Sequence, residues 1–161
     1  MTKTKVLFVC LGNICRSPLA EAIFKHKIKG KGLAKSFEAE SCGTANYHVG
    51  DSPDERTIRN AKKNGVEIDH VGRQLSERDL DYFDHILTMD ESNYRNVFKL
   101  TNAELNKEKI SLMRNYDPKG NGEVPDPYYG GESGFQEVFE ILDRSIENFL
   151  TQVSSKEFAN R

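Results

Sequence analysis

The sequence predicts an α/β fold in which a parallel β-sheet carries helices on both faces. Four short apolar runs have the length and the β-branched or aromatic content of buried strands: residues 5–9, 37–42, 84–89 and 109–113. The segments between them carry helix-start signals and helical spacing of apolar residues. Strands that alternate with helices form right-handed crossovers within one parallel sheet.

The composition is that of one ordinary globular domain. Of the 161 residues, 37% are hydrophobic and 30% charged, and neither a linker nor an internal repeat divides the chain. We therefore expect a single domain over residues 1–161. The net charge of -2 argues against nucleic acid as a partner. No apolar stretch approaches the length of a membrane span, and residues 6–11 are too short for an export signal, so we expect no membrane partner and a cytoplasmic protein.

The cysteines and histidines do not form a metal-binding pattern. Cys10, Cys15 and Cys42 cannot make a closed disulfide framework, and without an export signal they are expected to be reduced thiols. No Cys-x-x-Cys pair is present, and no histidine has ligand spacing to a cysteine. The sequence thus predicts no metal and no other cofactor. We assign structural roles to four of these side chains: His26, His48, His85 and Cys42.

The first helix is predicted to begin at Ser17–Pro18. Ser is a good N-cap, and Pro is favoured at the first helical position because its missing N–H would have no partner there. One apolar face is predicted from residues spaced by four, and Gly30 to Gly32 would end the helix. The residues on that face are Ala20, Phe24 and Ile28.

Further helix signals follow along the chain. Ser52 to Glu55 is typical of a capping box with Pro53 at the first helical position, and Gly65 is a helix stop. Ser76, Asp90 and Thr101 each resemble the cap of another helix. Residues 117–134 contain three prolines and are rich in turn signals. A last helix from Gly134 to Thr151 is predicted to face the core with one stripe: Phe135, Val138, Phe139, Leu142, Ile146, Phe149 and Leu150.

The segment between the first strand and the first helix, "CLGNICRS", lies where open α/β sheets bind ligands. Gly12 removes side-chain bulk, so that successive backbone N–H groups can converge on one anion beside the positive end of the helix. Arg16 supplies a planar fork for two phosphate oxygens. A Walker motif is absent. We therefore predict a phosphate-binding loop after the first strand: Leu11, Gly12, Asn13, Ile14, Cys15, Arg16 and Ser17.

The same loop supplies a nucleophile. A helix N-terminus and a guanidinium favour the thiolate form of Cys10 over the thiol. A nucleophile and an anion cradle in one loop suit the transfer of a phosphoryl group to sulfur. Taken alone, Cys10 is more typical of a small buried side chain and Arg16 of a solvated helix cap. The spacing, the Ser–Pro helix start and the preceding strand together favour the catalytic interpretation.

"CLGNICRSP" resembles the Cys-x5-Arg-Ser signature loop of the low-molecular-weight protein tyrosine phosphatases. Four more segments resemble family segments in the same order: "ESCGTANYHVG", "DHVGRQL", "LTMDESN" and "DPYYGG". The resemblance implies a four-stranded parallel sheet flanked by helices and no metal. It also implies hydrolysis of phosphotyrosine in proteins, or of small aryl phosphates, through a phosphocysteine intermediate, with inorganic phosphate as the product.

The resemblance implies that Cys10, Arg16 and Asp126 are the catalytic residues. Asp126 would protonate the departing phenolate and then accept a proton from water. Asp117, which also precedes a proline, is the competing carboxyl group, but "YDPKGNGE" is more typical of a surface turn. Asp90 is typical of a helix cap, although its segment resembles one that lies near the active site.

Two further groups of residues follow from the same resemblance. A polar network is expected to support the loop: Asn13, Ser17, Ser41 and His70. Apolar and aromatic side chains are expected to form a slot for a flat leaving group: Leu11, Ile14, Tyr47, Tyr128 and Tyr129.

Three alternatives compete with this interpretation. A thiol-dependent arsenate reductase on the same fold would carry extra cysteines downstream, whereas the last cysteine here is Cys42. A protein arginine phosphatase has a similar loop with Thr in place of Ile14, so the bulkier Ile14 favours phosphotyrosine. A silent phosphopeptide-binding module would lack the nucleophile or the acid, yet Cys10 and Asp126 are both present.

Cys15 follows Cys10 at a spacing that suggests redox protection. The loop curls around one phosphate, so modest backbone movement would bring the two sulfurs within bridging distance. Peroxide would oxidise Cys10 first, and Cys15 would capture the sulfenic acid as a disulfide. The family resemblance points the same way. The competing interpretation is that Cys15 only lines the loop.

Overall fold

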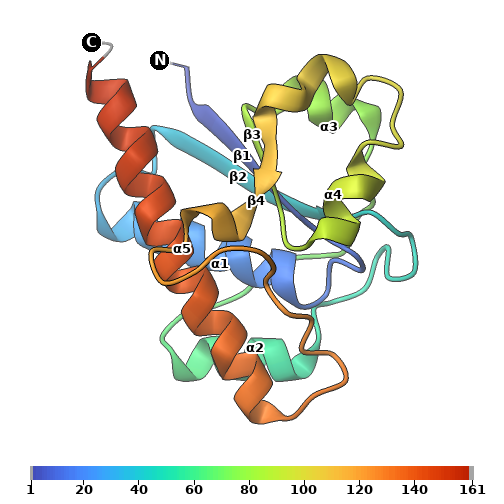
Figure 1. The fold of residues 1–161 in the computed structure, drawn as a ribbon. Coiled ribbons are helices and arrows are strands. Elements are labelled where there is room, and N and C mark those ends of the chain that lie inside the picture. Colours follow the sequence, from blue (N-terminus) through green and yellow to red (C-terminus); the bar gives the residue numbers. More distant parts are fainter. Residues whose placement is uncertain (1, 160–161) are drawn as a thin grey trace.

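The computed structural model describes residues 2–159, with side chains as far as residue 155, and contains the predicted α/β fold. Its sheet is parallel and has the order β2-β1-β3-β4 (Figure 1). The strands are β1 (Thr4–Cys10), β2 (Phe37–Gly43), β3 (His85–Thr88) and β4 (Ile110–Leu112). No helix within residues 2–159 is long and apolar enough to cross a membrane.

Five α-helices are described, together with two short 3-10 segments. They are α1 (Arg16–Gly30), α2 (Glu55–Lys63), α3 (Glu77–Tyr82), α4 (Glu91–Val97), α5 (Glu132–Ala159), η1 (Glu104–Lys109) and η2 (Met113–Tyr116). α1, α2 and α5 cover one face of the sheet, and α3 and α4 cover the other (Figure 1). The prediction of helices on both faces is thus confirmed.

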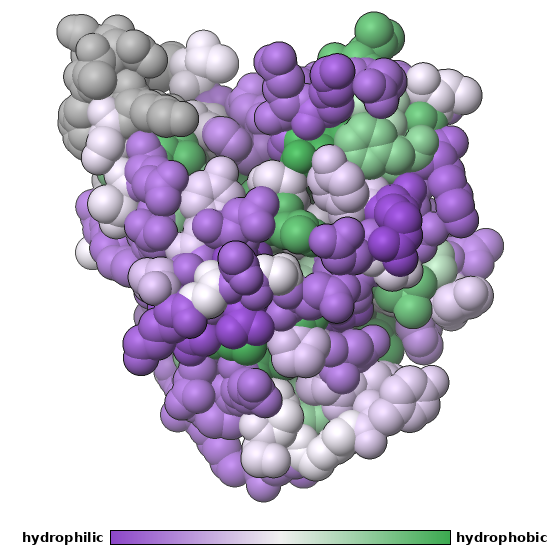
Figure 2. Space-filling model, in the orientation of Figure 1, coloured by the Kyte–Doolittle hydropathy of each residue, from purple (hydrophilic) through white to green (hydrophobic). Residues whose placement is uncertain are grey.

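Alternation along β1 places one set of side chains on each face of the sheet. Val6, Phe8 and Cys10 join the core beneath α1 and α5, whereas Leu7 and Val9 join the core beneath α3 and α4. On the face seen in Figure 2, hydrophilic residues dominate and hydrophobic ones are exposed in small separate areas. Most apolar side chains are therefore buried in two cores, one on each face of the sheet.

Several predicted helix boundaries are confirmed. Gly65 follows α2 with φ 81° in the left-handed region, as a helix stop requires. Ser76 precedes α3, where its N–H donates to the Asp79 carboxylate at 2.8 Å. Asp90 precedes α4, and its Oδ1 accepts from the Asn93 N–H at 2.7 Å.

Other boundaries were predicted wrongly. α1 begins at Arg16, with Cys15 in the cap position, because the Ser17 hydroxyl contacts the Cys10 sulfur and the Cys42 carbonyl of β2 instead of capping the helix. The cap of α2 is Asp54, not Ser52, and its carboxylate accepts from the Arg56 N–H. Pro53 therefore precedes the helix.

The last two boundary errors lie in the second half of the chain. Thr101 is not a helix cap: its hydroxyl donates to Glu77, and the following segment forms turns and then η1. α5 is longer than predicted, since it begins at Glu132 and continues to Ala159.

Asp117 is not part of an exposed turn. Its side chain is fully buried and accepts hydrogen bonds from Arg114 Nε at 3.0 Å and from Arg144 Nε at 2.7 Å. Burial works against its charge, but the bond from Arg144 and the bond from the Lys119 N–H hold the pKa of Asp117 below its usual value. The carboxylate thereby ties the segment after η2 to α5.

We expect Asp117→Asn to lower the free energy of unfolding by about 2 kcal/mol at neutral pH, because it leaves two partly exposed guanidinium groups without their anion. Urea unfolding measures this change. Because folding lowers the pKa, the stabilisation is present above the unfolded value of about 4 and is lost as pH falls through the folded value.

Asp143→Asn is the matched control, since Asp143 lies on α5 next to Arg144 and its half-exposed carboxylate pairs with Lys27. Its loss is expected to cost less than about 1 kcal/mol. Equal destabilisation by the two substitutions would contradict the assignment of a buried clamp to Asp117.

Candidate active site

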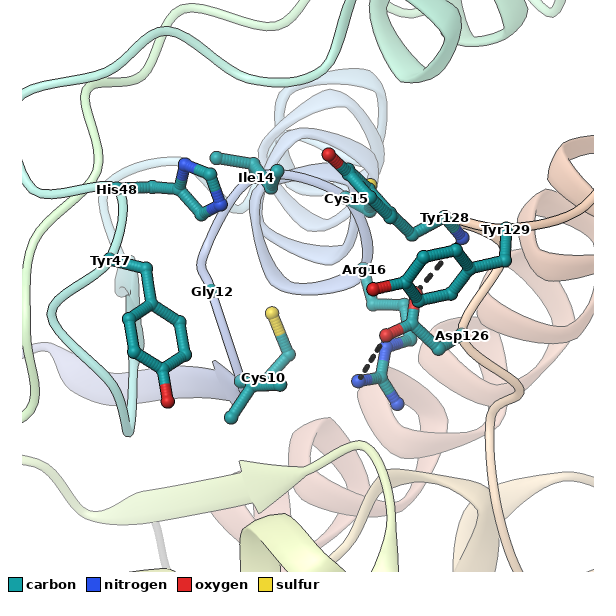
Figure 3. A pocket seen from close by; sticks show the side chains of 11 residues that line it. Cys10, Gly12, Ile14, Cys15, Arg16, Tyr47, His48, Asp126, Tyr128 and Tyr129 are labelled. Atoms are coloured by element: carbon teal, nitrogen blue, oxygen red, sulfur yellow. Dashed lines mark hydrogen bonds and ion pairs between the residues drawn. The ribbon is translucent and has the colours of Figure 1, made fainter.

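A pocket of about 300 Å³ opens at the carboxyl end of β1, where residues 10–17 turn into α1 (Figure 3). Tyr47 and His48 lie across it from Tyr128 and Tyr129, with Cys10 between (Figure 3). The structure thus brings the candidate catalytic and pocket residues to one place: Cys10, Leu11, Gly12, Ile14, Cys15, Arg16, Tyr47, His48, Asp126, Tyr128 and Tyr129. His48, which we had assigned to a purely structural role, lines the pocket and lies 3.1 Å from Asp51 Oδ2 through its Nδ1.

The backbone of the loop is held by bonds from neighbouring segments. Three of its carbonyl oxygens accept bonds from outside the loop: Cys10 from Thr44 N–H at 2.9 Å, Leu11 from Ala45 at 3.0 Å and Ile14 from Asp54 at 2.8 Å. In a planar trans peptide the N–H points opposite to the C=O. The N–H groups that follow these carbonyls are therefore directed away from those partners, as the predicted anion cradle requires.

Gly43, at the end of β2, allows the close approach of β2 to the loop. A Cβ at this position would lie 2.7 Å from the Leu11 carbonyl oxygen, which is closer than real Cβ atoms come. Glycine therefore fits where the chain must pack directly against the curled backbone.

Cys10 lies at the bottom of the pocket and is 3% exposed. Its Sγ is 2.9 Å from Ser17 Oγ. That hydroxyl accepts a bond from Asn13 Nδ2 at 2.8 Å, so its own proton is available to the Cys10 sulfur or to the Cys42 carbonyl oxygen at 3.3 Å. The arrangement can donate a hydrogen bond to a sulfur anion.

Arg16 is 2% exposed and is held by two different segments. Its Nη1 donates to Asp90 Oδ2 at 2.7 Å and to the Val124 carbonyl at 3.0 Å, while Nη2 lies 3.6 Å from Asp126 Oδ2 (Figure 3). Burial opposes the charge, but Cys10 and Asp90 raise the pKa of Arg16 above its usual value. Asp90 thus both caps α4 and orients the guanidinium.

Asn13 is the centre of the polar network beneath the loop. Its φ of 59° lies in the left-handed region. The amide donates to Ser17 Oγ and to Ser41 Oγ at 3.1 Å, while its oxygen accepts from Arg73 N–H at 3.0 Å and lies 2.6 Å from His70 Nε2. All four residues predicted to support the loop are therefore in one network.

Glu21 completes this network, and sequence reasoning did not single it out. The side chain is 7% exposed, and its Oε1 accepts from the Ser41 hydroxyl at 2.8 Å and lies 3.3 Å from His70 Nδ1. Burial opposes its charge, but bonds from His70 and Lys25 lower the pKa of Glu21. The available signal was its position four residues after Ser17 on one helix, which places both on the same face.

No group of three or more His, Cys, Asp or Glu side chains in the described part of the chain is placed to hold a metal ion. The pocket brings together a thiol, a guanidinium and a carboxyl group, those of Cys10, Arg16 and Asp126. A thiol can attack a phosphate ester, a guanidinium can bind it and a carboxyl group can protonate its leaving group.

Comparison with known proteins places this arrangement in a family. Residues 5–159 match the model for low molecular weight phosphotyrosine protein phosphatase. The protein of that name from Schizosaccharomyces pombe is 44% identical over 96% of this chain and 100% of its own length. The human protein of that name is 41% identical over 90% of this chain and 92% of its own length.

Solved structures agree with this match. A protein tyrosine phosphatase from Entamoeba histolytica, crystallised with Hepes in the active site, has a TM-score of 0.92 and 39% identity over 96% of this chain and 99% of its own. A Drosophila arginine phosphatase has a TM-score of 0.85 and 35% identity over 93% of this chain and 98% of its own. On the evidence of its fold and of these matches, the chain belongs to the low-molecular-weight protein tyrosine phosphatase family.

Proposed function

We propose that this protein hydrolyses phosphotyrosine in proteins, and small aryl phosphates, through a phosphocysteine intermediate. The observation that carries the proposal is the convergence of the Cys10 thiol, the Arg16 guanidinium and the Asp126 carboxyl group on one aromatic-walled pocket (Figure 3). The names of the related proteins support the same activity.

In the first step, the loop N–H groups and Arg16 bind the phosphate oxygens of the substrate. The Cys10 thiolate attacks phosphorus, so that an S–P bond forms while the P–O bond to the aryl group breaks. Asp126 gives its proton to the departing aryl oxygen. The cradle stabilises the charge that gathers on the equatorial oxygens in the transition state.

In the second step, the Asp126 carboxylate takes a proton from water as the water oxygen attacks phosphorus. The S–P bond breaks, inorganic phosphate leaves and Cys10 returns to the thiolate. The Ser17 hydroxyl, 2.9 Å from the sulfur, stabilises the leaving thiolate. Asp126 therefore acts as acid and then as base, and the reaction needs neither metal nor cofactor.

The pocket walls favour a flat aromatic leaving group. Tyr47 lies on one side of the pocket and Tyr128 on the other, and Ile14 and Leu11 add apolar surface (Figure 3). The second candidate is a phosphoarginine substrate, which is favoured by the likeness to the Drosophila arginine phosphatase. We rank it second because Ile14 narrows the slot at the position where we expect Thr in such enzymes.

We place this activity in the cytoplasm, with no nucleic-acid or membrane partner. All three cysteines, Cys10, Cys15 and Cys42, are unpaired, which fits a reducing compartment. The slightly negative net charge gives no reason to expect a polyanionic partner.

The function is tested by the turnover of phosphotyrosine, phosphoserine and phosphoarginine peptides, with arsenate reduction measured in parallel. We expect phosphotyrosine to be hydrolysed with the highest kcat/KM. Cys10→Ser is expected to abolish turnover and still bind inorganic phosphate in calorimetry, because the cradle and Arg16 are retained. Preferential phosphoarginine turnover would overturn the substrate assignment, and an active Cys10→Ser variant would overturn the nucleophile.

Asp126→Asn tests the proton donor through the leaving group. We expect kcat for phosphotyrosine to fall by at least about 100-fold, because the phenolate then departs without a proton. For dinitrophenyl phosphate, whose leaving group is acidic, the loss is expected to stay below about tenfold. Steady-state kinetics measure kcat on both substrates. An equal loss of kcat on the two substrates would show that Asp126 is not the acid.

Cys15 is proposed to protect Cys10 from irreversible oxidation. Its thiol would attack the Cys10 sulfenic acid, forming an S–S bond and releasing water. Burial raises the pKa of Cys15 to about 12, so this capture requires the loop to move first. After peroxide and then reductant, we expect the wild type to recover activity and Cys15→Ser not to. Equal recovery, with no Cys10–Cys15 bridge by mass spectrometry, would leave Cys15 as a lining residue only.

A further inference from the structure

Arg56 lies in the first turn of α2, where that helix meets the segment that carries Asp126. Its guanidinium carbon is 5.3 Å from the ring centroid of Tyr128 and 4.8 Å from that of Phe135. Both distances are within the range of cation–π attraction. Tyr128 lines the pocket, whereas Phe135 is a buried residue of α5. Arg56 therefore contacts one wall of the pocket and the core at the same time.

The guanidinium is itself held in place. Arg56 Nε donates to Asp54 Oδ1 at 3.1 Å, and Nη2 donates to Oδ2 at 2.9 Å. This fork holds the pKa of the Asp54 carboxyl below its usual value. The Asp54 N–H in turn donates to the Ile14 carbonyl of the phosphate loop. A short series of contacts thus runs from the loop through Asp54 and Arg56 to the ring of Tyr128.

Apart from Arg56, the segment around Tyr128 is anchored mainly on the side of Val124 and Asp126. Arg16 donates to the Val124 carbonyl at 3.0 Å and lies 3.6 Å from Asp126 Oδ2. Val124 bonds to the Met89 carbonyl at the end of β3, but the following backbone bonds are local. They join Tyr128 N–H to Asp126 and Gly130 N–H to the Pro127 carbonyl. Tyr129, which meets the Tyr128 ring edge to face, is 94% exposed and cannot fix it.

We propose that Arg56 is a positioning residue that holds the Tyr128 ring as one wall of the pocket and so favours aryl substrates over phosphate alone. The proposal rests on the function proposed above, since it concerns how the leaving group is recognised. Arg56 is not among the residues that line the pocket. It acts through Tyr128.

A purely structural role for Arg56 predicts different measurements. If Arg56 served only to begin α2, its loss would lower stability and leave KM unchanged. If it served only as a positive charge, its loss would weaken inorganic phosphate and aryl phosphate alike. Positioning of Tyr128 instead predicts a higher KM for aryl phosphates with unchanged phosphate inhibition, because phosphate occupies the cradle without touching the wall.

The experiment compares Arg56→Gln with Arg59→Gln, which removes the same charge from an exposed position on the same helix. The measurements are KM and kcat for a phosphotyrosine peptide, the inhibition constant of inorganic phosphate and the melting temperature. We expect Arg56→Gln to raise KM about fivefold, as the loss of an exposed cation–π contact suggests. Its kcat and phosphate inhibition should stay near the wild-type values, and Arg59→Gln should change none of these quantities.

A double-mutant cycle with Tyr128→Leu isolates the contact. In the Tyr128→Leu background, Arg56→Gln is expected to change KM by less than about twofold. Arg56→Lys, which keeps the charge and loses the planar fork, is expected to resemble Arg56→Gln and serves in its place if that variant does not fold.

Three outcomes would overturn the proposal. The first is an equal KM for Arg56→Gln and Arg59→Gln, and the second is a phosphate inhibition constant that rises as much as KM does in Arg56→Gln. The third is that Arg56→Gln raises KM as much in the Tyr128→Leu background as in the wild type. If the wild type hydrolysed no aryl phosphate, the proposed function would fail and this proposal with it. An active wild type with an unaffected Arg56→Gln variant would overturn the proposal alone.

Discussion

The buried guanidinium of Arg16 is the constraint on which the other parts of the site depend. A cation that is 2% exposed must be paired, because an uncompensated buried charge costs several kcal/mol. Its partners lie on two segments distant from α1: Asp90 at the start of α4, and Val124 just before Asp126. Arg16 is fully bonded only when both segments are in place. The pairing of this one buried side chain therefore links the folding of these segments to the assembly of the candidate active site.

The curled loop carries a second constraint, which Asn13 meets. A left-handed backbone is unfavourable for most residues, but Asn tolerates it better than bulkier side chains do. The Asn13 side chain then bonds to Ser17, Ser41 and the Arg73 N–H. These bonds hold the conformation and orient the Ser17 hydroxyl toward Cys10. The shape of the loop and the position of the Ser17 hydroxyl beside Cys10 thus rely on the same amide group.

What the sequence could predict depended on how local each feature is. The loop from Cys10 to Ser17 was recognisable because strand, glycine, arginine and helix start are neighbours in the chain. Ser52 and Asp54 are both good caps. The structure uses Asp54, whose N–H also bonds to the Ile14 carbonyl in the distant loop. Asp117 was misjudged for the same reason, because its partner Arg144 lies on α5. Glu21 had only its spacing of four from Ser17 as a local signal, and Arg56 had none that separates it from a solvated helix residue.

The phosphate cradle and the pocket walls are held very differently, and this has consequences for selectivity. The predicted cradle consists of one short loop whose carbonyls and polar side chains are bonded to buried or partly buried partners. The walls come from two separate segments, and Tyr47 and Tyr129 are 74% and 94% exposed. Substituting an exposed side chain usually changes stability little, whereas substituting a bonded buried one is costly. Substrate preference can therefore change at the walls while the cradle, and with it the chemistry on sulfur, is preserved.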